Sequence, residues 1–174
     1  MTLRSEQMLA RYSRWANEVI YDVVARLPES EVAAPRETVF GSVLRTLGHN
    51  YAVGAIFQAH LERRAHTFTV RLVPDTTTFD ALRTMQRELD AWYVTWIDGM
   101  KDGELDEAIR FQFVDGGTGV MTRREMLLHV VNHYTFHRGF AVDTLRRMAT
   151  VVPATDITVY LCDHVRRQEM TSLT

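Results

Sequence analysis

The 174-residue sequence contains a single cysteine, Cys162, and only four prolines. One cysteine forms no disulfide within the chain and builds no cysteine-based zinc site, which excludes a secreted disulfide scaffold. Lys and Arg number 20 against 22 Asp and Glu, so the basic excess of a typical duplex-binding domain is missing. No apolar run approaches the ~20 residues that span a bilayer, and the first residues lack the apolar core of a signal peptide. We therefore expect a cytoplasmic protein that binds neither nucleic acid nor membrane.

What is present is the composition of an ordinary globular chain. Hydrophobic residues make up 46% and charged residues 24%, which is too apolar for a disordered protein. A chain of this length buries a core without disulfides or metal staples. The sequence predicts one domain over residues 1–174.

Four long segments carry the spacing of helices. Their apolar residues recur at intervals of three and four, which marks one face of a helix. The segments run over about 5–27, 42–63, 79–100 and 123–149. Ser42 and Thr78 are candidate N-caps, and Thr122 with Glu125 fits a capping box. Four long helices with little strand predict an all-α four-helix bundle.

The connections between these segments differ in length and character. The short polar loop 29–38 favours antiparallel neighbours for the first two helices, whereas the longer linker 64–78 permits a crossover to the third. Residues 108–121 alternate apolar and polar around the turn signal Asp115-Gly-Gly-Thr-Gly, which leaves a short β-hairpin and an extended loop as alternatives. The tail over 156–167 is expected to form one more short helix.

Three of the seven histidines recur at every fourth residue of the last long segment: His129, His133 and His137. An i, i+4 pair lies on one side of a helix and can share a metal ion. At about 100° per residue, His137 lies about 80° from the centre of the apolar stripe, His133 about 120° and His129 about 160°. His133 and His137 are therefore the pair nearest the bundle interior, with His129 on the flank.

A third ligand must come from another helix, and His49 is the natural candidate because it shares an apolar line of the second segment. His60 lies on the same line but eleven residues further along, about 16 Å at 1.5 Å per residue, too far to bind the same ion. His66 and His164 lie in polar surroundings and are interpreted as having no role in the site. Spacing alone leaves two interpretations, a metal site and core histidines that hydrogen-bond to backbone or carboxylate groups.

The sequence resembles the DinB/YfiT-like family of metal-binding four-helix bundles over nearly its whole length. Four motifs, in the family's order and at suitable spacing, carry the resemblance. They are Tyr12-Ser-Arg-Trp-Ala-Asn17, Leu47-Gly-His49 with the run to His60, Leu128-His-Val-Val-Asn-His-Tyr-Thr-Phe-His-Arg-Gly139, and Pro153-Ala-Thr-Asp156. The third contains H-x-x-x-H-R-G, the most specific of the four.

The resemblance implies a metal triad on His49, His133 and His137, the residues that the helical geometry also favours. His129 matches a histidine that is often present in such motifs without being a usual ligand. The ion of the family is typically zinc or nickel, but three imidazoles suit zinc, nickel, iron or copper, so residue type alone does not choose among them. Three protein ligands leave coordination positions for water or substrate, as in catalytic rather than structural sites.

Two functions follow from the resemblance. Some similar proteins transfer low-molecular-weight thiols such as bacillithiol, mycothiol or glutathione, so the first hypothesis is a metal-dependent enzyme of thiol S-transferase or hydrolase type, acting on an unidentified small molecule. The second is a non-catalytic metal-binding or metal-stabilised helical module. The sequence identifies no general base. Asp115, in the glycine-rich turn, and Tyr134, on the ligand helix, are candidates to act beside the metal.

The last long segment is apolar over a wide arc, because four large residues lie off its main stripe. They are Met126, Leu128, Phe136 and Phe140. A helix of this kind has to be covered on several sides. Similar proteins are often homodimers, and we expect a homodimer here.

Overall fold

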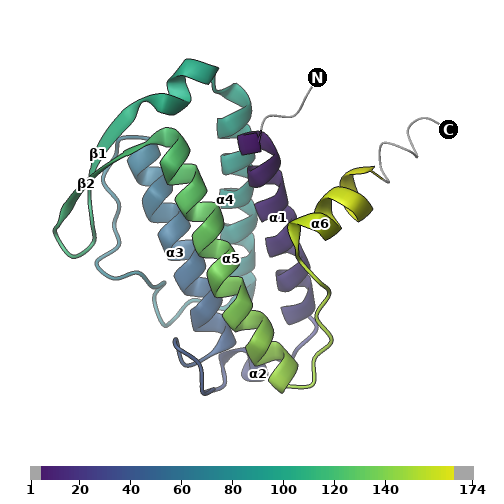
Figure 1. The fold of residues 1–174 in the computed structure, drawn as a ribbon. Helices are drawn as coiled ribbons and strands as arrows, with labels where there is room; N and C mark the ends of the chain where they lie inside the picture. The colour runs from purple at the N-terminus through teal and green to yellow at the C-terminus, as the bar shows by residue number, and fades with distance from the viewer. Residues whose placement is uncertain (1–4, 167–174) are drawn as a thin grey trace.

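The computed structural model describes residues 5–166, in which four long helices form a bundle (Figure 1). They are α1 (Ser5–Val24), α3 (Val43–Leu61), α4 (Phe79–Gly99) and α5 (Arg123–Arg147). The predicted four-helix bundle is thus confirmed, and every helix ends within three residues of its predicted bound. None of the helices in the described range is long and apolar enough to cross a bilayer.

The predicted helix caps form. The Ser42 hydroxyl accepts from the backbone N–H three residues on at 3.1 Å, and Thr78 does the same at 3.2 Å. Thr122 and Glu125 form the predicted capping box, in which each side chain accepts from the other's backbone N–H, at 3.1 Å and 2.7 Å. Each cap satisfies a donor that would otherwise be unpaired and contributes about 1 kcal/mol to helix stability.

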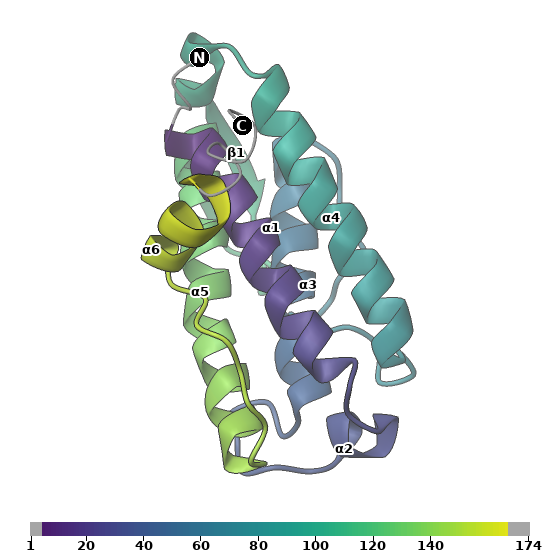
Figure 2. The same ribbon diagram turned by 90° about the vertical axis from the view of Figure 1, so that its right-hand side faces the viewer.

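The helices do not pack in the order of the chain. Helix α1 packs against α4 and α5, and α3 packs against the same two, so α1 and α3 lie on a diagonal (Figures 1 and 2). Ion pairs join α1 and α4 at both ends, Arg11 with Asp98 at 2.7 Å and Asp22 with Arg83 at 2.5 Å, which makes these helices antiparallel. The linker between α3 and α4 returns along the bundle, so these two run in the same direction.

The first two long helices are therefore antiparallel, but the prediction that they are neighbours is wrong. Their connection is not a simple polar loop, because it contains a short helix, α2 (Glu29–Ala33). Val32 of α2 is only 1% exposed and packs into a cluster of buried apolar side chains at one end of the bundle. This buried turn lets the chain cross the end of the bundle to the diagonal position.

The hairpin alternative is confirmed for the segment before α5. After a short 3₁₀ turn, η1 (Asp102–Asp106), strands β1 (Ala108–Gln112) and β2 (Thr118–Thr122) pair antiparallel, with Ala108 opposite Thr122. Ile109 and Phe111 face the core, while the intervening residues of β1 are exposed. Figure 1 shows the hairpin lying beside α3 and α5.

The predicted C-terminal helix is present as α6 (Ile157–Val159), continued by η2 (Tyr160–Val165). The end of the predicted segment, residue 167, lies outside the described residues. The Tyr160 ring packs 5.8 Å from that of Tyr12 and 5.5 Å from that of Trp15, measured between centroids. These contacts attach the tail to α1.

Candidate metal centre

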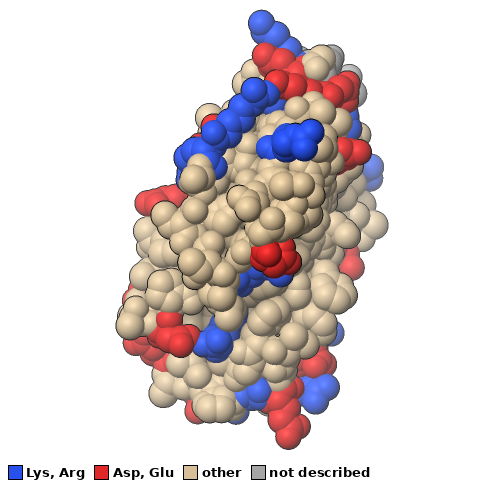
Figure 3. All heavy atoms as spheres, turned by 90° about the vertical axis from the view of Figure 1, so that its left-hand side faces the viewer, with Lys and Arg blue, Asp and Glu red and all other residues tan. Residues whose placement is uncertain are grey.

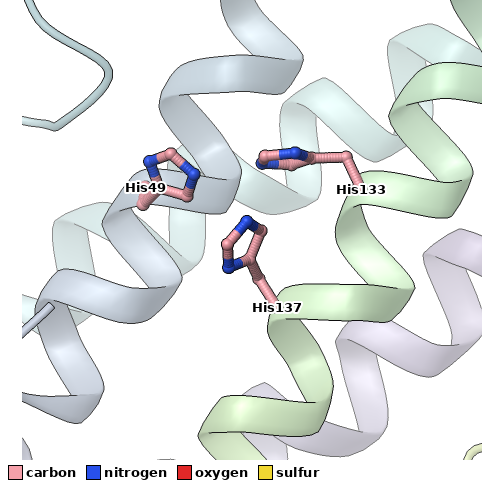
Figure 4. Close-up of side chains that lie close together, drawn as sticks. All are labelled: His49, His133 and His137. Carbon is pink, nitrogen blue, oxygen red and sulfur yellow. The ribbon is translucent and has the colours of Figure 1, made fainter. Parts of the chain in front are cut away.

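The three histidines predicted as ligands meet at the interface of α3 and α5. His49 lies in the second turn of α3, and His133 and His137 lie one turn apart on the antiparallel α5. Figure 4 shows the three imidazole rings converging from the two helices. One ring nitrogen of each lies within 4.8 Å of those of the other two. The predicted triad is therefore brought together in a geometry that could hold a metal ion.

Two ring nitrogens of this cluster are buried without a partner. His133 Nε2 and His137 Nδ1 are shielded from solvent and make no hydrogen bond with any described residue. Buried polar atoms are nearly always hydrogen-bonded, so each exception calls for an explanation. Two such exceptions in one cluster of imidazoles fit a site whose partner is a metal ion.

His49 is held by the backbone of the linker between α3 and α4. Its Nδ1 lies 2.7 Å from the Arg71 carbonyl oxygen, so this nitrogen carries the proton and donates. The lone pair is then on Nε2, the nitrogen left for a ligand. Metal-binding histidines commonly donate their second N–H to a carbonyl in this way, which fixes tautomer and ring orientation.

The environment keeps the cluster unprotonated. Burial, together with the neighbouring imidazoles, lowers the pKa of His133 to about 3 and that of His137 to about 4. Burial also lowers the pKa of His49. At neutral pH all three rings are therefore neutral, which is the state that coordinates a metal.

Aromatic side chains border the cluster. The Phe40 ring stacks on His49 with centroids 4.3 Å apart and meets His137 edge-on at 5.3 Å. Phe136 and Phe140 lie 5.0 Å and 5.6 Å from His137. Figure 3, which views the side of the hairpin, shows that most of the middle of this face is uncharged. The cluster is therefore bordered by aromatic rings.

His129 lies on the flank of the cluster, as predicted. Its ring centroid is 5.7 Å from that of His133 and 4.5 Å from that of Phe57, and the residue is exposed. It is not among the three residues whose ring nitrogens come within reach of one another.

The other histidines are elsewhere in the fold. His60 packs against His66, with centroids 5.4 Å apart, near the end of α3, which agrees with its predicted separation from His49. His164 stacks on Tyr160 at 5.5 Å in the C-terminal segment.

Neither residue that sequence reasoning placed beside the metal contacts the cluster. Asp115 is exposed at the hairpin turn, where its carboxylate lies 3.3 Å from the Arg71 guanidinium. Tyr134 is 1% exposed and lies in the bundle core, where its hydroxyl accepts from Gln86 Nε2 at 3.5 Å. A Cβ at Gly54 would lie 1.8 Å from that hydroxyl, so only glycine fits opposite it.

Two neighbours of the cluster were missed by sequence reasoning. Arg71 acts through its backbone carbonyl, for which no residue type is diagnostic. Phe40 lies in a loop outside any periodic segment, so its contact with His49 had no signal in the sequence.

The chain is similar to known proteins in sequence and in fold. The chain is 26% identical to protein DinB of Bacillus subtilis over 159 residues, which cover 88% of this chain and 91% of that protein. Its fold is similar to a DinB-like protein from Bacillus cereus (TM-score 0.65, 17% identity, 88% of this chain and 99% of the other). It is also similar to a conserved protein from Enterococcus faecalis (TM-score 0.58, 16% identity, 83% and 97%). The family model for the DinB family matches residues 1–169, and the chain belongs to that family.

Proposed function

We propose that this protein binds one divalent metal ion, zinc or nickel, through His49, His133 and His137. The observation that carries the proposal is the pair of buried, unpartnered nitrogens on His133 and His137, beside a His49 ring whose proton is held by Arg71. Neutral imidazoles are ligands for both ions. The three nitrogens lie within 4.8 Å of one another, so only small movements of the histidine side chains would bring them to bonding distance of one ion.

We further propose that the site is that of a metal-dependent enzyme, of thiol S-transferase or hydrolase type. Three protein ligands leave positions open for water or a substrate thiol, and a bound divalent ion lowers the pKa of either. The residues of this chain supply the surroundings. Phe40 limits the motion of His49, and Phe136, which is 63% exposed, offers a contact for the apolar part of an electrophilic substrate.

Metal content is the first test. Untagged protein, before and after incubation with zinc or nickel and removal of excess ion, is analysed by elemental mass spectrometry beside His137→Ala. We expect close to one equivalent per chain, lost in the variant. His164→Ala removes a histidine of the C-terminal segment and is the matched control, which should retain the metal. Absence of metal from the native protein under all these conditions would contradict the proposal.

The second test separates an enzyme from the non-catalytic alternative. The metal-loaded protein is screened with glutathione, bacillithiol and mycothiol against electrophilic substrates, and for hydrolysis without thiol. Turnover that disappears in His133→Ala supports the enzyme. A full complement of metal with no turnover, combined with a higher free energy of unfolding when metal is bound, supports a metal-stabilised module.

We also propose a homodimer. Two of the four residues behind this prediction have large exposed side chains on α5, Leu128 at 43% and Phe136 at 63%, whereas Met126 is fully buried in the core. Light scattering after size-exclusion chromatography distinguishes the 20.1 kDa chain from a particle of twice that mass. Cytoplasmic location and the absence of nucleic-acid binding stay predictions.

A further inference from the structure

A cavity lies away from the histidine cluster, between the end of α3 and strand β1. Its volume is about 520 Å³, within the range of small-molecule sites. Three arginines, two histidines and an aromatic ring are among the residues that line it, and none of the lining residues is acidic. They are Arg63, Arg64, Arg110, His60, His66 and Phe111. On α3 this cavity is eleven residues, about 16 Å, from His49.

The arginines outnumber the carboxylates that neutralise them. Arg64 pairs with Glu62 at 2.5 Å, and Arg63 pairs with Glu107. Glu107 is also the partner of Arg123 at 2.7 Å, so one carboxylate serves two guanidinium groups. Arg110 forms no ion pair with any described residue. Figure 3 shows basic side chains gathered over the upper part of the face on which the hairpin lies.

The wall also contains polar groups with free hydrogen-bonding capacity. All five residues of β1 line the cavity, and because successive residues alternate between the faces of a strand, it is the strand's edge that borders the space. The two-stranded sheet leaves that edge unpaired, with its backbone N–H groups available. His66 Nδ1 is shielded from solvent and makes no hydrogen bond within residues 5–166.

Arg63 has a positive backbone φ at the end of α3, as Ala149 has at the end of α5. Helix α3 ends with backbone hydrogen bonds from Arg64 N–H to the Ala59 carbonyl and from Arg63 N–H to the His60 carbonyl, both near 3 Å. This termination usually has glycine in the left-handed position, yet the residue there is Arg63, with φ of 56°. Arg63 follows directly on the last turn of α3 and lines the cavity.

We propose that this cavity binds a small organic anion through its carboxylate or phosphate oxygens. Guanidinium groups and backbone N–H groups provide the donors that such oxygens accept. The His60 ring, packed 4.9 Å from Phe111, forms an uncharged wall against which the rest of the ligand lies. Burial lowers the pKa of His60 to about 4, so at neutral pH this ring is uncharged, whereas the arginines carry positive charge. The site is independent of the metal proposed for the histidine cluster.

The test is titration calorimetry of the full chain at low ionic strength, with inorganic phosphate, phenyl phosphate, succinate and benzoate as separate ligands. Binding of the phosphates alone or of the carboxylates alone identifies the anion class, and tighter binding of the phenyl compounds supports the aromatic wall. Arg110→Gln should weaken binding about tenfold or more, because it removes a charge-assisted contact.

Two further variants make the result decisive. Arg63→Gly removes the guanidinium and relieves the positive φ, so it should fold at least as well as the native chain while binding the anion about tenfold more weakly. Arg146→Gln makes the same charge change on an exposed residue near the end of α5 and should bind normally. No saturable binding of any of the four anions, or equal weakening in Arg146→Gln and Arg110→Gln, would overturn the proposal.

Discussion

Among the buried polar side chains of the described bundle, a group around Asn17 and the histidine cluster differ in how their polar atoms are paired. Between α1, α4 and α5, Asn17 donates to both carboxylate oxygens of Asp90 at 3.0 Å and 3.1 Å and accepts from Arg138 at 3.0 Å. Between α3 and α5, His133 and His137 each hold a buried nitrogen without a partner. The first group is a structural network in which the Asn17 amide joins Asp90 to Arg138, whereas the second has two buried ring nitrogens that are available to a ligand.

The physical costs of the two groups differ accordingly. A buried charge is tolerated when hydrogen bonds replace water. Burial raises the pKa of Asp90 to about 7, even though the hydrogen bonds from Asn17 and Gln86 act in the opposite direction. The histidines avoid the cost by staying neutral, since burial lowers their pKa. We therefore expect stability to depend on Asn17, and the proposed metal affinity to depend on the histidines.

The largest expected effect follows from removal of the Asn17 side-chain amide, which hydrogen-bonds to both Asp90 and Arg138. Asn17→Leu leaves the Asp90 carboxylate and the Arg138 guanidinium short of partners, and we expect the free energy of unfolding to fall by about 3–5 kcal/mol. Urea denaturation measures it. Asn132→Leu, on the exposed side of α5, is the control and should change stability by less than about 0.5 kcal/mol. A loss below about 1 kcal/mol in Asn17→Leu would show that the network is dispensable.

Addition of zinc should distinguish the histidine cluster from the network around Asn17. With free zinc at a hundred times its dissociation constant, the free energy of unfolding should rise by about 2.7 kcal/mol. We expect this increment to vanish in His137→Ala and to persist in Asn17→Leu, because Asn17 does not contact the cluster. The measurement is urea denaturation with and without zinc. If zinc stabilised both variants equally less than the native chain, the histidine cluster and the network around Asn17 would be energetically coupled, contrary to this prediction.

Acid should weaken the metal-free protein through its histidines. The pKa values of His133 and His137 are lowered, so between about pH 6.5 and pH 4 the unfolded chain binds more protons than the folded one, and stability falls as the pH falls. By pH 5 each contributes a loss of about 1–2 kcal/mol. Asp90, whose pKa is raised, acts with the opposite sign as the pH rises toward 7.

The contribution of the histidines is therefore measured as a difference. Urea unfolding with chelator present, from pH 7.5 to pH 4.5, compares the native chain with His133→Ala/His137→Ala, in which Asp90 is unchanged. The native chain should lose more stability than the double variant over this window. Parallel curves would contradict the depressed pKa values of the pair.

The features that sequence reasoning predicted are those that repeat along one helix. The spacing of His133 and His137 is local, so it indicated a shared side of α5, and the caps at Ser42 and Thr122 are equally local. His49 is predicted as the third ligand because it shares a line of apolar residues that faces the bundle interior. The resemblance to the family implies the same three residues. All three are indeed adjacent in the fold.

Sequence reasoning failed where tertiary packing decides. The diagonal placement of α1 and α3 depends on which faces are covered by the other helices and by α2, which no single segment reveals. Asp90 lies on a helix with many charged residues, where a carboxylate is expected to be solvated, yet it is 4% exposed. The support of His49 by Arg71 uses a backbone carbonyl, and every residue has one.

The smallest predicted effect concerns the ion pair between Asp115 of the hairpin and Arg71, whose backbone carbonyl accepts from His49. Asp115→Ala removes the ion pair with Arg71, whose side chains are 71% and 48% exposed, so stability should fall by less than about 0.5 kcal/mol. Metal affinity should weaken by no more than about threefold, since the His49 hydrogen bond to the Arg71 backbone does not need the side chain. Competition with a zinc chelator measures the affinity, and Asp143→Ala, which removes the exposed pair with Arg147 on α5, is the control. A tenfold or larger loss confined to Asp115→Ala would show that the hairpin holds the linker in place, and the histidine cluster would then depend on a charge that lies outside the helices.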